Sequence, residues 1–420
     1  MRLSRIVELI APTARSDPLR APSANRRHGV RGVPRGGSLI DATLINLSAE
    51  HPAHLLDPVT GRLATEESLA RVLPPRLARM ELTDEPTIPV PAELAELYGT
   101  FRPTPLFEAT RFAAALGTDC RIHVKDEGTT PSGNHKANSA LWVAYHCAQD
   151  GVRTLATETT GNWGVALAQA AARFGLEVLC FLDSASAAAR PDRAAMMREA
   201  GAEVVVVGED RADGFDPLVL SANAAIDHVR EMPGVRYIFG SVYNYFILPQ
   251  TLVGQEALAQ LGGEAPDVVV GSCGGGANLL GIAAPFLGRP GVDVVCAESE
   301  HCPVVSAGVF GDYSIDDRDF YPRLRTYGLE RLLGSEYIGG LGSTLVAAPV
   351  AAFHRRGDLA TRTFTSAEAV KAARLFEECE GRAVALETGY QLAAVVAEAR
   401  ARSRQRILVN ISSTGHSRFA

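Results

Sequence analysis

Three glycines after an apolar run could hold an anion. DVVVGSC is followed by GGGAN, in which Gly274, Gly275 and Gly276 let the backbone approach a ligand closely. The helix expected next, LLGIAAPFL, would point N–H groups and a partial positive charge at a phosphate. The spacing matches neither G-x-G-x-x-G nor a Gly-Lys-Ser/Thr loop, which argues against dinucleotide and nucleoside triphosphate binding. A tight strand-to-helix turn without a ligand is the alternative interpretation.

A lysine at the start of an expected helix could act as a nucleophile. In GTTPSGNHKANSAL, Ser132 or Asn134 can cap the helix, and Lys136 falls in its first turn, where the helix dipole disfavours a cation. We therefore expect a lowered pKa for Lys136, which suits a neutral amine that forms a Schiff base with an aldehyde cofactor. A solvated surface lysine is the alternative, but the apolar stretch ANSALWVAY favours burial.

Two further stretches place polar groups at the ends of expected strands. In ATETTGNWGVALA, Glu158 precedes a turn and could either cap the helix that begins near Asn162 or transfer protons in a site. Ser412, Ser413 and Thr414 follow the run RILVNI. A neutral hydroxyl at such a position suits a pyridine nitrogen that stays unprotonated.

The composition of the chain is that of a globular protein. It has 420 residues, of which 46% are hydrophobic and 21% are charged, and this length and composition allow two domains. Its net charge is −7. Without basic clusters in the body of the chain, we expect no nucleic acid and no membrane as partner. Seven scattered cysteines without a C-x-x-C pair indicate reduced thiols in a cytoplasmic protein and no metal site. Residues 271–289 carry a single charge, Arg289, and residues 337–353 carry none, but both stretches are broken by glycines and a proline, so neither predicts a membrane span.

The order of apolar runs indicates the elements that position these residues. From about residue 120, short β-rich runs alternate with segments of helix length, which predicts β/α units around mostly parallel, buried strands. The expected strands are RIHVKDE, TLATET, EVLCFL, EVVVVG, RYIFG, DVVVGS, DVVCAES and RILVNIS. The expected helices span 135–149, 163–174, 190–200, 215–231, 248–262, 366–380 and 388–402. Because ligands of open parallel sheets sit beyond the C-terminal strand ends, the segments that follow each strand should carry function.

Taken together and in this order, four stretches resemble one enzyme family. GNHKANSAL, TETTGNWGVALAQAAA, GSCGGGAN and VNISS are similar to the pyridoxal-phosphate enzymes of fold type II, specifically the tryptophan synthase β-subunits. The region from DPVTGR to FRPTPLFEA resembles the stand-alone, second-type β-subunits, as do GSVYNYFILPQTLVGQEA, RLRTYGL and GGL. The resemblance covers about residues 50 to 420 and implies an α/β fold with two three-layer α/β/α domains, mostly parallel sheets and the cofactor between them.

The expected organisation has four parts. Residues 1–45 would be a basic, disordered arm, although eight arginines and two acids within the first 37 residues also resemble a transit peptide or an over-extended start. Residues 46–100, punctuated by prolines and with one or two helices, would wrap the core and shape an entrance. Residues 101–245 would form mainly the smaller domain, although residues 101–134 could pack with the larger domain instead. Residues 246–420 would form the larger domain, which carries the phosphate cup.

The resemblance also implies roles for single residues. Lys136 would bind pyridoxal 5′-phosphate as a Schiff base and remove the substrate's α-proton, and His135 would help hold the phosphate. Glu158 would help expel the β-hydroxyl of serine and then take a proton from the nucleophile. Glu387 would lie near the cofactor ring, and Ser412 would face the pyridine nitrogen. The phosphate cup would comprise Gly274, Gly275, Gly276, Ala277 and Asn278, and the substrate would contact Thr159, Thr160, Gly161, Asn162 and Trp163.

The activity that the resemblance implies is a lyase-type β-replacement. L-Serine or a related β-substituted amino acid would lose its β-substituent to give an aminoacrylate, to which indole or a related nucleophile adds. Small molecules are thus the expected partners; a homodimer is expected, and an α-subunit is not required. Elimination of serine or threonine, replacement with a nucleophile other than indole, and a non-catalytic binding protein are the alternatives.

Several departures from the family bear on the substrate. In tryptophan synthases the corresponding turn reads Glu-Thr-Gly-Ala-Gly-Gln followed by His or Trp. Here it is Glu158-Thr159-Thr160-Gly161-Asn162-Trp163, which is one residue shorter and is similar to the turn of threonine dehydratases, threonine synthases and cysteine synthases. Ala277 stands where the family usually has serine. NISSTGHSRF carries extra residues, and GGLGSTLVAAP lacks the usual aromatic and basic residues. These departures alter the walls of the site more than its cofactor residues.

Overall fold

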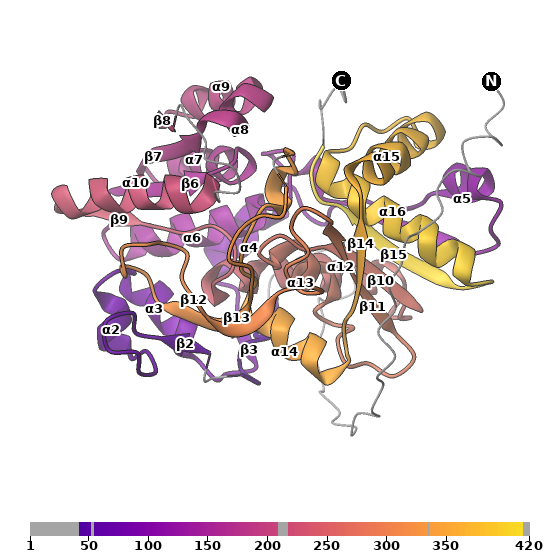
Figure 1. Ribbon diagram of the computed structural model, residues 1–420, viewed down its shortest axis with the longest axis horizontal. Coiled ribbons are helices and arrows are strands. Elements are labelled where there is room, and N and C mark those ends of the chain that lie inside the picture. Colours follow the sequence, from indigo (N-terminus) through magenta and orange to yellow (C-terminus); the bar gives the residue numbers. More distant parts are fainter. Residues whose placement is uncertain (1–41, 52–53, 209–216, 335, 415–420) are drawn as a thin grey trace.

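The computed structural model describes residues 42–51, 54–208, 217–334 and 336–414, so the expected basic arm lies almost wholly outside the described residues. The described chain is built around two mainly parallel sheets, each packed with helices, and two small antiparallel sheets (Figure 1). The fold is α/β, as the sequence predicted.

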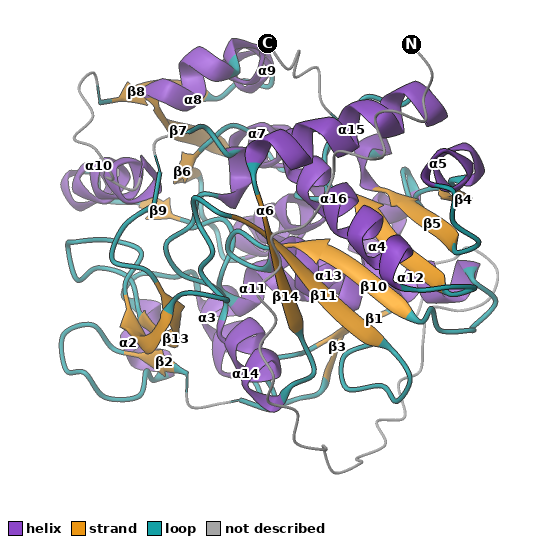
Figure 2. Ribbon diagram, turned by 45° about the vertical axis from the view of Figure 1, so that its right-hand side comes forward, coloured by secondary structure: helices purple, strands orange, loops and turns teal. Residues whose placement is uncertain are grey.

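The larger sheet has six strands in the order β14-β11-β10-β15-β5-β4, all parallel except β4. Successive residues of a strand point to opposite faces, and both faces of this sheet are apolar. In β10, Val268 and Val270 pack with α5, α15 and α16, whereas Val269 packs in the cluster that contains α12 and α13. Figure 2 shows these helices around the strands of the sheet. These elements are β4 (Leu106–Glu108), β5 (Arg121–Asp126), β10 (Val268–Ser272), β11 (Asp293–Ser299), β14 (Ala360–Phe364), β15 (Arg406–Ile411), α5 (Thr110–Leu116), α12 (Thr251–Gln260), α13 (Ala277–Ala283), α15 (Ser366–Glu380) and α16 (Leu386–Ala401).

The smaller sheet has four parallel strands in the order β8-β7-β6-β9. Helices α7 and α10 contact both β6 and β7, and α9 contacts β8. Helix α6 packs on α7 and carries the lysine turn at its start. These elements are β6 (Thr154–Thr159), β7 (Glu177–Asp183), β8 (Glu203–Val207), β9 (Val235–Tyr237), α6 (Ala137–Gln149), α7 (Asn162–Arg173), α8 (Ser184–Ala189), α9 (Pro191–Glu199) and α10 (Pro217–Glu231).

The remaining elements lie against these two layers. Helices α3 and α4 contact α6, β1 contacts α12, and β2 pairs with β13 of a three-stranded sheet. The elements are β1 (Thr43–Ile45), β2 (Leu55–Leu56), β3 (Thr87–Pro89), β12 (Val309–Tyr313), β13 (Arg323–Gly328), α2 (Glu66–Ala70), α3 (Pro75–Leu82), α4 (Ala92–Gly99), α11 (Asn244–Ile247), α14 (Ala348–Arg356) and 3₁₀ turns at Glu127–Thr129, Leu248–Gln250 and Gly339–Leu341.

All eight expected strands and all seven expected helices are present within a few residues of their predicted bounds. The expectation of one or two helices in residues 46–100 was too low, because α3 lies between α2 and α4. By strand pairing, β4 and β5 belong to the six-stranded sheet, beside β15. No described helix is long and apolar enough to cross a membrane.

Candidate active site

The turn that carries Lys136 is held against the end of the last strand. The amide of His135 donates to the carbonyl of Ser412 at 2.8 Å, and the amide of Thr414 donates to the carbonyl of Gly133 at 2.9 Å. Strands β5, β15 and β10 are neighbours in the larger sheet, so their C-terminal ends lie side by side. The lysine turn, the serines after β15 and the glycines after β10 consequently meet at one edge of the sheet.

Lys136 is the residue at which helix α6 begins. Its amide donates to Asn134 Oδ1 at 3.0 Å, but Lys136 is itself the N-cap residue and no side-chain capping hydrogen bond forms at this end, so neither Ser132 nor Asn134 caps the helix. Enclosure by protein lowers the pKa of Lys136, and the carboxylates of Glu158 and Glu387 oppose that shift. The expected lowering is therefore present, but burial is its main cause rather than the helix dipole.

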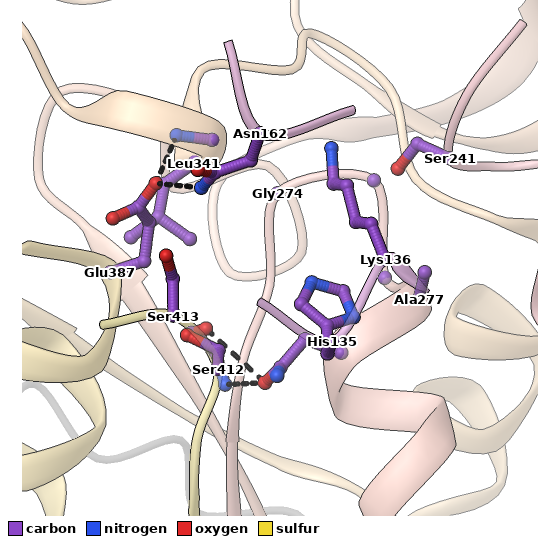
Figure 3. A pocket seen from close by; sticks show the side chains of 15 residues that line it. His135, Lys136, Asn162, Ser241, Gly274, Ala277, Leu341, Glu387, Ser412 and Ser413 are labelled. Carbon is purple, nitrogen blue, oxygen red and sulfur yellow. Dashed lines mark hydrogen bonds between the residues drawn. The ribbon is translucent and has the colours of Figure 1, made fainter. Parts of the chain in front are cut away.

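A cavity at this edge is lined by the side chain of Lys136 and most of the predicted cofactor residues (Figure 3). Figure 3 shows the lysine, the histidine beside it, the glycine turn and the serines after β15 around one space. The lining residues are His135, Lys136, Asn162, Ser241, Ser272, Gly274, Gly275, Gly276, Ala277, Asn278, Gly340, Leu341, Glu387, Ser412 and Ser413.

The glycine turn can only be built from residues without side chains. A Cβ added to Gly275 would lie 2.0 Å from Ser241 Oγ, and one added to Gly274 would lie 2.2 Å from the carbonyl oxygen of Gly340. Gly276 has a φ of +106°, which L side chains rarely adopt. The turn is thus a cradle of bare backbone along the cavity wall.

Asn278 adds a side-chain donor to the cradle. Its Oδ1 accepts from the amide of Ser272 at 3.2 Å and from the hydroxyl of Ser272 at 3.3 Å. Its Nδ2 is buried and has no hydrogen-bond partner among the described residues. A buried amide N–H without a partner costs free energy, which an anion in the cavity would recover. Together with the glycine cradle, this donor fits a bound phosphate.

A hydroxyl pair lies after β15. Thr388 Oγ1 accepts from the amide of Ser412 and lies 3.1 Å from Ser412 Oγ. Because Thr388 Oγ1 already accepts from that amide, its own hydrogen can go to Ser412 Oγ, which leaves the Ser412 hydrogen free for a ligand. This arrangement suits a neutral acceptor such as an unprotonated pyridine nitrogen.

Glu158 is buried at the end of β6, and its carboxyl group forms hydrogen bonds with residues outside the adjacent helix α7. Tyr237 Oη donates to its Oε2 at 2.6 Å, and the amide of Gly240 donates to its Oε1 at 3.2 Å. Burial raises the pKa of Glu158 to about 7, although both hydrogen bonds act in the opposite direction. Thr159 Oγ1 instead accepts from the amides of Gly161 and Gly164, each at 2.9 Å, at the start of α7. The capping interpretation of Glu158 is therefore wrong.

A second cavity joins Lys136 to Glu158. Its apolar wall includes Trp163, whose Nε1 donates to Thr157 Oγ1 at 2.7 Å and whose ring meets the edge of Phe246. Three of the predicted substrate residues line this cavity, namely Thr159, Thr160 and Trp163, and Asn162 lines the first one. Gly161 lines neither of these two cavities, and its amide is engaged by Thr159.

Glu387 connects the two halves of the site. Its Oε1 accepts from the amide of Gly340 at 2.9 Å and from Asn162 Nδ2 at 3.5 Å (Figure 3). Asn162 begins α7 on the smaller sheet, whereas Glu387 is in the first turn of α16 on the larger one. The carboxylate thus lies between the predicted cofactor and substrate residues.

Several contributors to the site were not singled out from the sequence. They are Tyr237, Ser241, Gln250, Gly340 and Thr388. The rule that function follows strand ends could have identified Tyr237 and Ser241, because both lie at or just after β9. Sequence spacing gives no comparable signal for Gln250, which contacts His135 across 115 residues.

The fold and the site define a class: an α/β enzyme with a phosphate cradle, an enclosed lysine and a buried carboxyl group around one cavity. Residues 97–413 match the family of pyridoxal-phosphate dependent enzymes, and the chain belongs to that family. Its fold is accordingly fold type II, and its cofactor is pyridoxal 5′-phosphate. The described residues contain no cluster of His, Cys, Asp and Glu that could hold a metal ion.

Several relatives of this chain are tryptophan synthase β chains. The protein is 34% identical over 385 residues to the tryptophan synthase beta chain of Thermococcus gammatolerans, which covers 86% of this chain and 88% of the relative. It is 33% identical over 404 residues to tryptophan synthase beta chain 2 of Thermotoga maritima, covering 88% and 94%. The identity to beta chain 2 of Pyrococcus abyssi is 34%, covering 86% and 88%. The resemblance seen in the sequence is confirmed.

Proposed function

We propose that the protein replaces the β-hydroxyl of L-serine, or the β-substituent of a related amino acid, by indole or a related carbon nucleophile. The observation that carries the proposal is Glu158, a buried carboxyl group with a pKa of about 7 that shares a cavity with Lys136. A β-replacement needs a group that first gives a proton to the leaving hydroxyl and then takes one from the nucleophile. A carboxyl group that titrates near neutrality can do both.

The residues around the first cavity would hold the cofactor. Lys136 would bind its aldehyde carbon, while His135, the turn Gly274–Gly276, Ala277 and Asn278 would hold its phosphate. Ser412 would donate to the pyridine nitrogen, with Glu387 near the ring. When bound there, pyridoxal phosphate supplies the electron sink that makes the α-proton of an amino acid removable.

The chain's own groups would then move the protons. The Nζ of Lys136, whose pKa is lowered by enclosure, accepts the α-proton of the substrate. Glu158 donates a proton to the departing β-oxygen and, once ionised, accepts one from the incoming nucleophile. Thr159, Thr160 and Asn162 would hold the substrate's carboxylate, and Trp163 forms an apolar wall beside its β-carbon. The apolar wall excludes water from the reacting atoms.

Elimination is the second candidate, because the turn at Thr159–Asn162 has the short form found in dehydratases. The test uses the loaded enzyme with L-serine, with and without indole, and identifies products by mass. We expect tryptophan with indole and slow pyruvate release without it. Rapid pyruvate and ammonia formation that indole neither slows nor diverts would overturn the proposal in favour of elimination. The Lys136→Ala variant serves as the control and should lose both products and the visible absorbance of the bound cofactor.

We further propose that the protein acts in the cytoplasm as a homodimer without an α-subunit, as expected from its resemblance to second-type β-subunits. All seven cysteines are buried, which is in keeping with a reducing compartment. Sedimentation of the purified chain tests the assembly, and activity of that chain alone tests the independence from a partner subunit.

A further inference from the structure

One ring nitrogen of His135 forms a hydrogen bond within the protein, and the other does not. Its Nδ1 lies 2.9 Å from Gln250 Oε1, while its Nε2 makes no hydrogen bond with the residues that the structure describes. The ring is only 8% exposed and belongs to the wall of the first cavity, next to Ala277 (Figure 3). The free nitrogen is therefore the one available to a ligand in that cavity.

A chain of hydrogen bonds fixes the direction of the Gln250 amide. Ser139 Oγ donates its single hydrogen to the carbonyl of Phe246 at 2.6 Å, so it must accept from Gln250 Nε2, also at 2.6 Å. The same Nε2 donates to the carbonyl of His135 at 3.0 Å. Both contacts require the NH₂ group at that position, which leaves Oε1 to face the imidazole.

This direction determines where the ring carries its hydrogen. Because Gln250 Oε1 can only accept, Nδ1 of His135 must be the protonated nitrogen. In the neutral ring, Nε2 then carries a lone pair and no hydrogen. A phosphate dianion offers only acceptors, so the neutral ring cannot donate a hydrogen bond to it.

We propose that the phosphate of the cofactor binds together with one additional proton, held on His135 Nε2, and that Gln250 is the positioning residue that imposes this requirement. The proton comes from solvent, and no covalent bond forms or breaks. His135 would thus contact the phosphate as an imidazolium, with Nδ1–H donating to Gln250 and Nε2–H donating to the phosphate.

Because of its surroundings, His135 lacks this proton in the cofactor-free protein and takes it up when the cofactor binds. Burial lowers the pKa of His135 to about 4; Lys136 beside it also lowers the pKa, and Glu127 raises it. The side chains that face it from the other packed elements, Gln250 and Ala277, are uncharged. The ring is therefore neutral at pH 8 without the cofactor, and the phosphate ester, with a second pKa of about 6, arrives as a dianion.

Calorimetry of the full chain freed of its cofactor tests the proposal. The chain is titrated at pH 8 with pyridoxal phosphate and, separately, with pyridoxal, in buffers of different ionisation enthalpy. Any proton exchanged at Lys136 is common to both ligands and cancels in the difference. We expect pyridoxal phosphate to take up about one proton more than pyridoxal, and equal uptake would overturn the proposal.

Two variants separate the role of Gln250 from general damage. Gln250→Leu releases Nδ1, lets the neutral ring carry its hydrogen on Nε2, and should bring the extra uptake toward zero. Gln255→Leu is the matched control, since Gln255 is a buried glutamine five residues later whose Nε2 donates to the carbonyl of Thr43. It should retain the extra proton.

A spectroscopic measurement on the unaltered chain does not depend on the folding of a variant. Nitrogen NMR of ¹⁵N-histidine in the cofactor-free protein distinguishes the two neutral forms of His135. We expect the Nδ1–H form, and on addition of pyridoxal phosphate the shifts of an imidazolium. A neutral Nε2–H ring in either state would overturn the proposal.

Discussion

Glu158 and Tyr237 share a buried hydrogen bond that sets the acidity of the carboxyl group. Burial and the nearby carboxyl raise the pKa of Tyr237 well above its usual value, so the phenol remains a donor at every pH of interest. Its hydrogen bond stabilises the ionised form of Glu158 and so offsets part of the effect of burial on that group. The balance leaves the pKa of Glu158 near neutral pH, where the carboxyl group can both donate and accept a proton.

The pH dependence of turnover should therefore respond to Tyr237. In the proposed reaction, expulsion of the hydroxyl needs protonated Glu158, so the rate should fall as the pH rises through about 7. Tyr237→Phe removes a bond that favours the carboxylate, and the falling limb should move to higher pH. Glu158→Gln should abolish this limb and slow turnover by about 10²- to 10⁴-fold, while exchange of the substrate's α-proton with D₂O persists. An unshifted limb in Tyr237→Phe would contradict this account.

At the residue scale, the sequence indicated polar groups near the C-terminal ends of strands. Glu158 was singled out because it lies near the end of an expected strand, β6, and Lys136 because it stands at the start of the helix that follows β5. Their partners were not, since Tyr237 reaches Glu158 across 79 residues and Thr388 reaches Ser412 across 24. Such contacts depend on how strands are ordered in a sheet, which local spacing does not encode.

Helix α6 carries an unusual buried histidine nearly three turns after Lys136. His146 packs at the edge of Trp142, with ring centroids 4.4 Å apart, and neither ring nitrogen has a partner among the described residues. Burial lowers the pKa of His146 to about 4, and Arg76 acts in the same direction. The folded helix thus tolerates only the neutral ring.

This histidine should make the helix sensitive to acid. Its pKa is near 6.5 when unfolded and about 4 when folded, so its stabilising effect is complete above pH 6.5 and is lost as the pH falls toward 4. The loss amounts to about 3 kcal/mol. Thermal unfolding of the wild type and His146→Leu at pH 8 and pH 4.5 checks this. The variant should gain on the wild type at the lower pH, and an unchanged difference would contradict the assignment.

At the element scale, buried parallel strands were the most predictable part of the fold. Their long apolar runs, such as DVVVGS, leave few alternatives. The strands β12 and β13 were missed because neither is a continuous apolar run: β12 has no buried residue, β13 alternates buried with more exposed residues, and both pair only within a small sheet. Helix α3 was missed although Pro75 is its first residue, a position at which proline is favoured.

A buried network of charges joins segments from across the whole molecule. Arg102 donates to both oxygens of Glu256, at 2.7 and 2.8 Å, and to Glu127 and Asn138. Lys125 donates to the same glutamate at 2.8 Å. These residues come from the connection between α4 and β4, from β5 and the turn after it, and from α6 and α12. The network therefore ties the connection that follows α4 to the helix of Lys136 and to the larger sheet.

Breaking this network should cost global stability. Arg102→Met leaves two buried carboxylates without their main partner, and we expect the free energy of unfolding to fall by about 3–5 kcal/mol in urea titrations. Arg79→Met is the control, because the Arg79–Glu66 pair is exposed. It should lose less than about 1 kcal/mol. Similar small losses of unfolding free energy in both variants would show that the network does not contribute substantially to the stability of the fold.

The attachment of the lysine turn to the end of β15 has a consequence for biosynthesis. Strand β15 occupies the middle of the larger sheet, between β10 and β5, and the residues just after it hold His135 and Gly133 in place. A nascent chain on the ribosome therefore carries Lys136 for most of its synthesis without the strand that fixes it. Cofactor loading has to wait until residue 414 has left the exit tunnel, and products of premature termination before β15 will be inactive even though they contain Lys136, Glu158 and the glycine turn.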